Sequence, residues 1–191
     1  MTKTILSALV LAVAISFASC SNNKACNNKQ DAAATQANDT ANAASNNQEQ
    51  ADGSTKYTDF TLPTLDGKRV LLSEVVAKNK ITMVDFWASW CGPCRMEMPN
   101  VVKAYKDFHD KGLEIVGVSL DERKEDWAEA VKEMGMTWIQ ASDLKGWKSE
   151  AARLYKVEGI PACVLINQKG EIVGADLRAE ELHARLAELL K

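Results

Sequence analysis

Between Ser21 and Ser54 the chain runs for 34 residues without a single Leu, Ile, Val, Met, Phe, Tyr or Trp. Ala, Asn, Gln, Ser, Thr and Asp make up most of this segment. Such a segment cannot bury enough apolar surface to offset the entropy lost when it is ordered. We therefore expect residues 20–54 to be a disordered tether and residues 55–191 to be one folded domain. Its 137 residues are enough to form a core without a disulfide staple.

The N-terminus predicts export. Lys3 supplies a positive charge, residues 5–17 form an apolar run of 13 residues, and small residues follow at 18–20. This layout is typical of a secretory signal peptide, and the run is too short to span a bilayer comfortably. Residues 17–20, Phe-Ala-Ser-Cys, resemble a bacterial lipobox. We thus expect a lipoprotein-type signal peptide over residues 1–19 and lipidation of Cys20, with anchoring at the periplasmic side of a bacterial membrane. Ser21 after the cysteine slightly favours the outer membrane. Cleavage without lipidation and an uncleaved anchor remain as alternatives.

The charge balance gives no broad electrostatic footprint for nucleic acid. Lys and Arg number 23 against 26 Asp and Glu, for a formal net charge of -3. Nucleic-acid-binding domains carry a basic patch or stripe, which a slightly acidic chain does not suggest. We expect a monomer with no nucleic-acid partner.

The folded part alternates predicted strands and helices, which indicates an α/β fold. Residues 81–87 are an almost continuous apolar run, as expected of a central strand covered on both faces. A helix over 93–110 leads to a second buried strand over 113–120 by a βαβ crossover. Residues 57–72 have the pattern of a hairpin turning at Asp66-Gly67. The other predicted elements are a short helix opened by Ser73, helices over 125–134, 149–155 and 179–190, and strands over 137–141, 162–166 and 171–174.

The chemistry lies where the strand over 81–87 turns into the helix. Cys91-Gly92-Pro93-Cys94 places two thiols three residues apart, with Pro93 in the first helical turn. The helix N-terminus directs unpaired N–H groups and the positive end of its dipole at Cys91, which lowers the pKa of that thiol. Cys91 is therefore predicted to be the nucleophile of a redox pair and Cys94 the resolving thiol.

Two other functions use the same spacing. A zinc site would need two more ligands, and His109, His183, Cys26 and Cys163 are not paired at ligand spacing. We expect no metal. A structural disulfide is the other alternative, but so short a loop constrains the unfolded chain little.

The segment from Val84 to Met96, with Pro99, closely resembles the active-site segment of thioredoxins, and residues 159–161 resemble their cis-proline loop. The export signal, the opening hairpin and the extra segment over 125–155 resemble the TlpA/ResA branch of bacterial thiol-disulfide oxidoreductases. The resemblance covers residues 55–191. It implies a thioredoxin fold, with a central mixed β-sheet flanked by helices, an N-terminal β-hairpin and a central insertion. It also implies that the Cys91–Cys94 disulfide is the redox group, without a further cofactor.

The same resemblance assigns roles to two residues near the dithiol. Asp85, an acidic group in an apolar strand, matches the thioredoxin residue that lies beneath the dithiol and moves protons for the resolving cysteine. Burial of such a carboxyl raises its pKa. Pro161 is implied to be a cis-proline beside Cys91. The alternatives are a structurally satisfied carboxylate at Asp85 and an ordinary strand entry at Pro161.

The substrate-binding surface is assigned to Trp90, Gly92, Pro93 and Ile160, because Ile160 would offer backbone groups to an extended substrate chain. Trp90 resembles the exposed indole beside the nucleophile; a surface aromatic without a role is the alternative. Trp87 is predicted to be packed in the core.

Three further residues are less closely matched to the family. Glu122 is a candidate acid or base, because ResA-like proteins hold an acidic group near the dithiol; the alternative is a solvated acidic cluster with Asp121. Cys163 is predicted to be a buried, apolar-like side chain, with a third redox thiol as the alternative. Cys26, on the tether, is free to pair between molecules.

Together these features predict an enzyme that reduces disulfides of exported proteins and is recharged by a membrane electron donor. A Gly-Pro spacer resembling that of reducing thioredoxins favours this direction. A thiol oxidase or isomerase on the same fold, a thiol peroxidase and a non-enzymatic binding module remain alternatives. Ala88 stands where the peroxidase motif has Thr.

Overall fold

The computed structural model describes residues 55–191. The predicted signal peptide, the lipidation of Cys20, the tether and Cys26 fall on residues 1–54 and lie outside the described residues. Within residues 55–191, no helix combines the length and the apolar character needed to cross a membrane.

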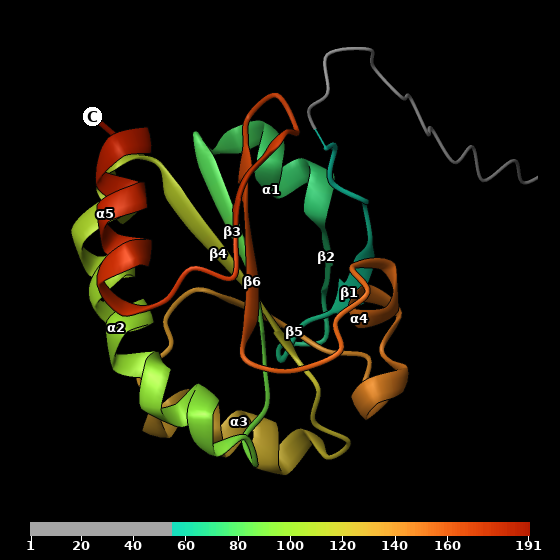
Figure 1. Ribbon diagram of the computed structural model, residues 1–191. Helices are drawn as coiled ribbons and strands as arrows, with labels where there is room; N and C mark the ends of the chain where they lie inside the picture. The colour runs from blue at the N-terminus through green and yellow to red at the C-terminus, as the bar shows by residue number, and fades with distance from the viewer. Residues whose placement is uncertain (1–54) are drawn as a thin grey trace, which may run out of the picture. The chain divides into compact units, whose positions relative to one another are not determined.

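Five strands form a mixed sheet in the order β5-β4-β3-β6-β7 (Figure 1). The central strand β3 (Ile81–Trp87) pairs in parallel with β4 (Leu113–Ser119) and antiparallel with β6 (Ala162–Asn167). The edge strands are β5 (Ile139–Ala141), parallel to β4, and β7 (Ile172–Ala175), antiparallel to β6. All of β3 is buried, as the apolar run predicted. Because β3 and β4 run parallel, their carboxyl ends meet at one edge of the sheet, where β3 leads into α2.

The N-terminal hairpin is a separate two-stranded sheet of β1 (Thr61–Pro63) and β2 (Arg69–Leu71). The prediction of a strand from residue 57 was wrong, since β1 begins only at Thr61. The reason is that the preceding segment pairs elsewhere: the Tyr57 N–H donates to the Gly170 carbonyl, 3.2 Å away in the turn between β6 and β7.

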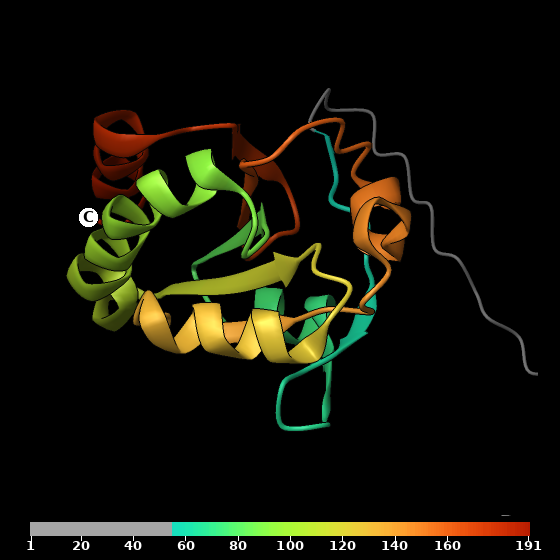
Figure 2. The same cartoon turned by 90° about the horizontal axis from the view of Figure 1, so that it is seen from below.

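Five helices surround the central sheet. Their bounds are α1 (Leu72–Lys78), α2 (Gly92–Phe108), α3 (Lys124–Glu133), α4 (Glu150–Leu154) and α5 (Ala179–Leu189), with 3-10 turns at His109–Lys111 and Gly146–Lys148. Helices α2 and α5 lie together on one face, and α1, α4 and the hairpin lie on the other (Figures 1 and 2). The thioredoxin-like α/β fold is thus confirmed.

Helix α1 starts differently from the prediction. It begins at Leu72, and Ser73 lies within its first turn rather than opening it. The Ser73 N–H donates instead to the Asp59 carboxylate at 2.9 Å. A carboxylate 14 residues upstream therefore satisfies one of the free donors at this helix N-terminus.

Buried apolar side chains hold helix α2 in place. Met98, Val101 and Phe108 are buried, and α5 contributes buried Leu182 and Leu186. Burying each such side chain contributes about 1.5–3 kcal/mol, so this packing holds α2 firmly and fixes where its N-terminus lies.

Candidate active site

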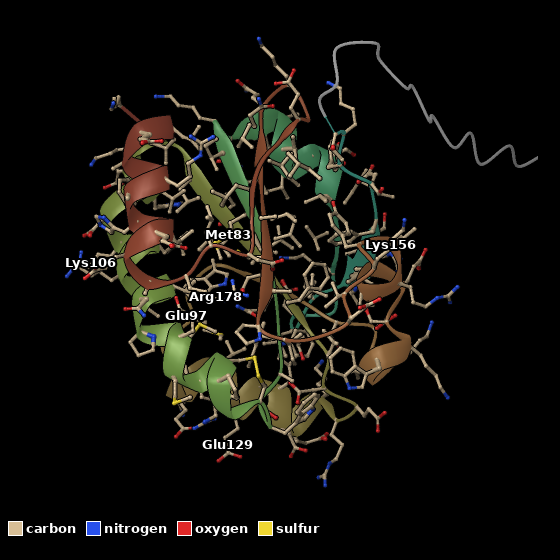
Figure 3. All side chains as sticks on the ribbon, in the orientation of Figure 1. Met83, Glu97, Lys106, Glu129, Lys156 and Arg178 are labelled. Carbon is tan, nitrogen blue, oxygen red and sulfur yellow. A yellow bond between two sulfur atoms is a disulfide. The ribbon has the colours of Figure 1, made fainter. Side chains whose placement is uncertain are left out.

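The turn from β3 into α2 holds two cysteines in a disulfide, Cys91–Cys94. It appears as a yellow bond near the lower end of the sheet in Figure 3. Cys91 is the N-cap residue of α2, and its sulfur accepts a hydrogen bond from the Cys94 N–H at 3.1 Å. Pro93 lies in the first turn, where its missing N–H removes no helical hydrogen bond. This geometry favours a thiolate on Cys91 after reduction, because the helix N-terminus stabilises negative charge on that sulfur.

Asp85 lies in the middle of the central strand. Its register partners are Gly117 on β4 and Cys163 on β6, and its side chain is buried. Burial raises the pKa of Asp85 to about 7; the positive charge of Arg178 acts against this rise, and the negative charge of Glu97 adds to it. The carboxyl group therefore changes protonation state close to neutral pH.

The loop before β6 faces Cys91. The Ile160–Pro161 peptide bond is cis, as predicted. The Cys91 sulfur lies 3.7 Å from the Ile160 carbonyl oxygen. A groove of about 610 Å³ runs along this loop, with Tyr155 and Arg178 also in its wall. The groove exposes the backbone of Ile160, the residue whose carbonyl lies beside the Cys91 sulfur.

Asp121 is a buried carboxylate, not predicted from the sequence, that holds the turn before Cys91. Asp121 follows β4 and accepts the Ser89 hydroxyl at 2.6 Å, the Ser89 N–H at 3.1 Å and the Ser119 hydroxyl at 2.7 Å. It is only 1% exposed, so the alternative of a solvated cluster with Glu122 was wrong for Asp121. Its location directly after a strand parallel to β3 was the available signal.

Three large apolar side chains are exposed in the turn before α2, in its first turns and in the Gly146–Lys148 turn. Trp90 is 56% exposed, Met96 is 75% exposed, and Trp147 is 49% exposed. The rings of Trp90 and Trp147 have centroids 6.2 Å apart and form one aromatic surface. Gly92 and Pro93 are exposed beside them, whereas Trp87 is fully buried, as predicted.

Two other predicted residues, Glu122 and Cys163, are placed as follows. The Glu122 side chain covers Gly146, where a Cβ would lie 2.8 Å from its Oε1 atom. Within residues 55–191 it forms no hydrogen bond with the dithiol. Cys163 is buried, and burial raises the pKa of its thiol to about 11. Its burial agrees with the predicted apolar-like role.

Glu97 was also missed. It lies three residues after Cys94, on the same side of α2. Its Oε1 atom accepts the Ala179 N–H at 2.7 Å, which places its carboxylate at the start of α5. No group of three His, Cys, Asp or Glu side chains in the described part of the chain is arranged to hold a metal ion.

Comparisons with known proteins agree with this geometry. The model of the AhpC/TSA family matches residues 54–175. Thiol-disulfide oxidoreductase ResA of Bacillus thuringiensis subsp. konkukian is 30% identical over 132 residues, which cover 69% of this chain and 73% of the relative. The thioredoxin domain of a thiol-disulfide oxidoreductase from Bacteroides vulgatus has a TM-score of 0.67 and 33% identity, covering 72% of this chain and 97% of that one. A thiol-disulfide oxidoreductase from Bacteroides fragilis has a TM-score of 0.67 and 31% identity, covering 71% and 100%. The chain therefore belongs to the AhpC/TSA family of the thioredoxin superfamily and is a ResA-like thiol-disulfide oxidoreductase.

Proposed function

We propose that the protein reduces disulfides in exported polypeptides while a lipid on Cys20 tethers it to a bacterial membrane. The observation that carries the reductase proposal is the Cys91–Cys94 pair at the start of α2, beside the Ile160 carbonyl and the exposed aromatic surface. The tether and the anchor rest on the sequence of residues 1–54.

The reaction begins with the reduced dithiol. The Cys91 thiolate attacks one sulfur of the substrate disulfide, that S–S bond breaks, and the leaving substrate thiolate takes up a proton. The Cys94 thiolate then attacks the Cys91 sulfur, which forms the Cys91–Cys94 disulfide and releases the second substrate thiolate. Two electrons pass from the dithiol to the substrate, so an electron donor at the membrane must return two electrons to the enzyme for each cycle.

Asp85 supplies proton transfer in the second step. Cys94 is buried and must lose its proton before it attacks. A base is most effective when its pKa lies near the working pH, and the pKa of Asp85 is about 7. Replacing Asp85 with Asn should slow resolution of the mixed disulfide. Stopped-flow kinetics that are unchanged across pH would remove this role.

The aromatic surface of Trp90 and Trp147 is the docking site for the polypeptide around the substrate disulfide. Exposed aromatic rings bind apolar side chains with little loss of conformational entropy, because they have few rotatable bonds. Trp147 comes from the segment between β5 and α4, which lies within the predicted insertion. Met96 adds an adaptable apolar contact.

Reduction of insulin in the presence of a chemical donor tests the activity. Cys91→Ser should abolish turnover and trap no mixed disulfide through residue 91. Cys26→Ser, a matched cysteine change in the predicted tether, should retain full activity. Equal activity of both variants would contradict the proposal and leave a binding module as the alternative.

The reduction potential of the dithiol tests the direction of electron flow. A value near thioredoxin's, roughly -270 mV, supports a reductase, and one near -120 mV would make the protein a disulfide donor. Consumption of hydroperoxide at a rate comparable to insulin reduction would favour the peroxidase alternative. Mass spectrometry of the membrane-extracted protein tests the anchor, because Cys20→Ser should eliminate the added acyl mass.

A further inference from the structure

Arg178 is a partly buried arginine next to the loop at Pro161. It is the N-cap residue of α5, and its side chain is 29% exposed. One guanidinium nitrogen donates to the Pro161 carbonyl. The other donates to the Leu177 carbonyl at 2.9 Å and contacts the Cys163 sulfur at 3.4 Å. The guanidinium group thus binds the Pro161 carbonyl, which directly follows the Ile160 carbonyl beside Cys91.

The backbone around Arg178 is built to hold this side chain inward. Asp176 and Ala179, on either side of it, have φ values of 52° and 43°, which side-chain-bearing residues adopt only at a cost. Asp176 stays bound to β6: its N–H donates to the Cys163 carbonyl at 2.8 Å, and its carboxylate accepts the Cys163 N–H at 3.2 Å. Glu97 accepts the Ala179 N–H on the other side. These contacts fix both ends of the turn that carries Arg178.

The same turn brings a positive charge to Asp85. The titratable groups around Asp85 are Glu97 from α2, Cys163 from β6 and Arg178 from the start of α5, and β4 presents only Gly117 at the paired position. The dithiol follows at the end of the same strand. Figure 3 labels Arg178 and Glu97, which lie side by side where α2 meets the start of α5. Arg178 is the cation of this group.

We propose that Arg178 is a positioning residue of the dithiol site, which holds the loop at Pro161 through its guanidinium and places a compensating positive charge beside Asp85. The two effects arise from different properties of the side chain. The charge acts on Asp85 at a distance and needs only a cation. The loop is held by a planar group that donates to two carbonyls at once, which an ammonium group reproduces poorly.

The charge effect is tested on the oxidised full chain, by following Asp85 through a ¹³C-carboxyl NMR titration. The Asp85 signal is assigned by its absence in Asp85→Asn. Wild-type protein should titrate near pH 7. Arg178→Gln should move the midpoint upward by about 1 pH unit or more, because a nearby opposite charge lowers a carboxyl pKa by about 1–3 units. Arg178→Lys should keep the midpoint close to the wild-type value.

Arg185→Gln is the matched control. Arg185 is also on α5 and also donates to a carbonyl, that of Val173 at 2.9 Å, but it does not contact the loop at Pro161. Its replacement should leave the Asp85 midpoint unchanged. A midpoint that moves no further in Arg178→Gln than in Arg185→Gln would overturn the charge effect.

The loop effect is tested with Arg178→Lys in the insulin assay. Lysine should lose one of the two hydrogen bonds to carbonyl groups. Because that bond holds the loop, its loss should raise KM by about threefold or more and leave kcat little changed. A wild-type KM in this variant would overturn the loop effect. If Arg178→Gln does not fold, Arg178→Met is titrated in its place, with the same expected shift and the same overturning result. The inference deepens the role proposed for Asp85, but the titration uses no substrate. It can therefore succeed or fail independently of the proposed reductase function.

Discussion

Replacing Asp85 with Asn should change how stability depends on pH. The Asp85 carboxyl titrates near 7 in the folded chain and near its ordinary value of 3.8 in the unfolded chain. The folded chain therefore binds this proton about 1000-fold more tightly, which corresponds to about 4 kcal/mol.

The sign follows from which state holds the proton. Below pH about 4 both states hold it, so the burial of Asp85 causes no electrostatic penalty. Between about pH 4 and 7 only the folded chain holds it, and the free energy of unfolding falls as the pH rises. Above pH 7 the folded chain contains a buried carboxylate, and the full loss of about 4 kcal/mol is present. Asn cannot ionise, so Asp85→Asn should lack this loss.

Urea unfolding of the oxidised protein, followed by tryptophan fluorescence at pH values from 4 to 8, measures the effect. The stability of Asp85→Asn relative to wild type should rise across this range by up to about 4 kcal/mol. Comparing the difference between pH values cancels the cost of burying the amide and the titration of distant groups. Asp66→Asn is the control. Its hydrogen bond with Thr64 is the main reason that its pKa lies well below the usual range, so it stays ionised throughout. If the difference in unfolding free energy between Asp85→Asn and wild type stays constant within about 1 kcal/mol from pH 4 to 8, burial does not raise the pKa of Asp85 as described.

The structure also predicts measurable effects at three other residues, Asp121, Cys163 and Trp147. Asp121→Ala should lower the free energy of unfolding by about 3 kcal/mol, because it leaves the Ser89 donors unpaired; an effect below about 1 kcal/mol in the same urea assay would contradict this. Cys163 should react with iodoacetamide only after unfolding, since it is buried and its pKa is raised to about 11; rapid labelling of the native protein, read by mass spectrometry, would restore the third-thiol alternative. Trp147→Ser should raise KM for insulin by about fivefold while leaving reduction of a small aromatic disulfide unchanged. Equal changes for both substrates would indicate that the ring supports the fold rather than docking.

Local signals predicted the centre of the site well. The apolar run of β3, the helix signals of α2 and the Cys91-Gly92-Pro93-Cys94 spacing all act within one stretch of chain, and the structure places them as expected. Asp85 was recognisable because a lone acid in an apolar strand has few alternatives to burial.

Residues that reach the site from distant elements were harder to predict. Asp121 begins a run of polar and charged residues, a pattern typical of a solvated surface, and its burial follows only from the meeting of the ends of β3 and β4. The predicted start of the hairpin was wrong because a local pattern suggested a strand that does not form there. Tyr57 fits an alternating strand pattern, but its backbone partner, Gly170, lies more than a hundred residues away. A strand is formed by its partner as well as by its own residues, and the partner is not visible in the local pattern.

The pKa of Asp85 depends both on its local sequence and on residues from distant elements. Burial alone follows from the sequence of β3, and it raises the pKa. Arg178 lowers it more than Glu97 raises it, so without these two charges the carboxyl would titrate above 7 and would hold its proton too tightly to serve as a base at neutral pH. Both charged groups are fixed at one junction, because Glu97 binds the residue that follows Arg178. The start of α5, about ninety residues after the strand, therefore keeps a buried acid within the range where it can take up and release a proton.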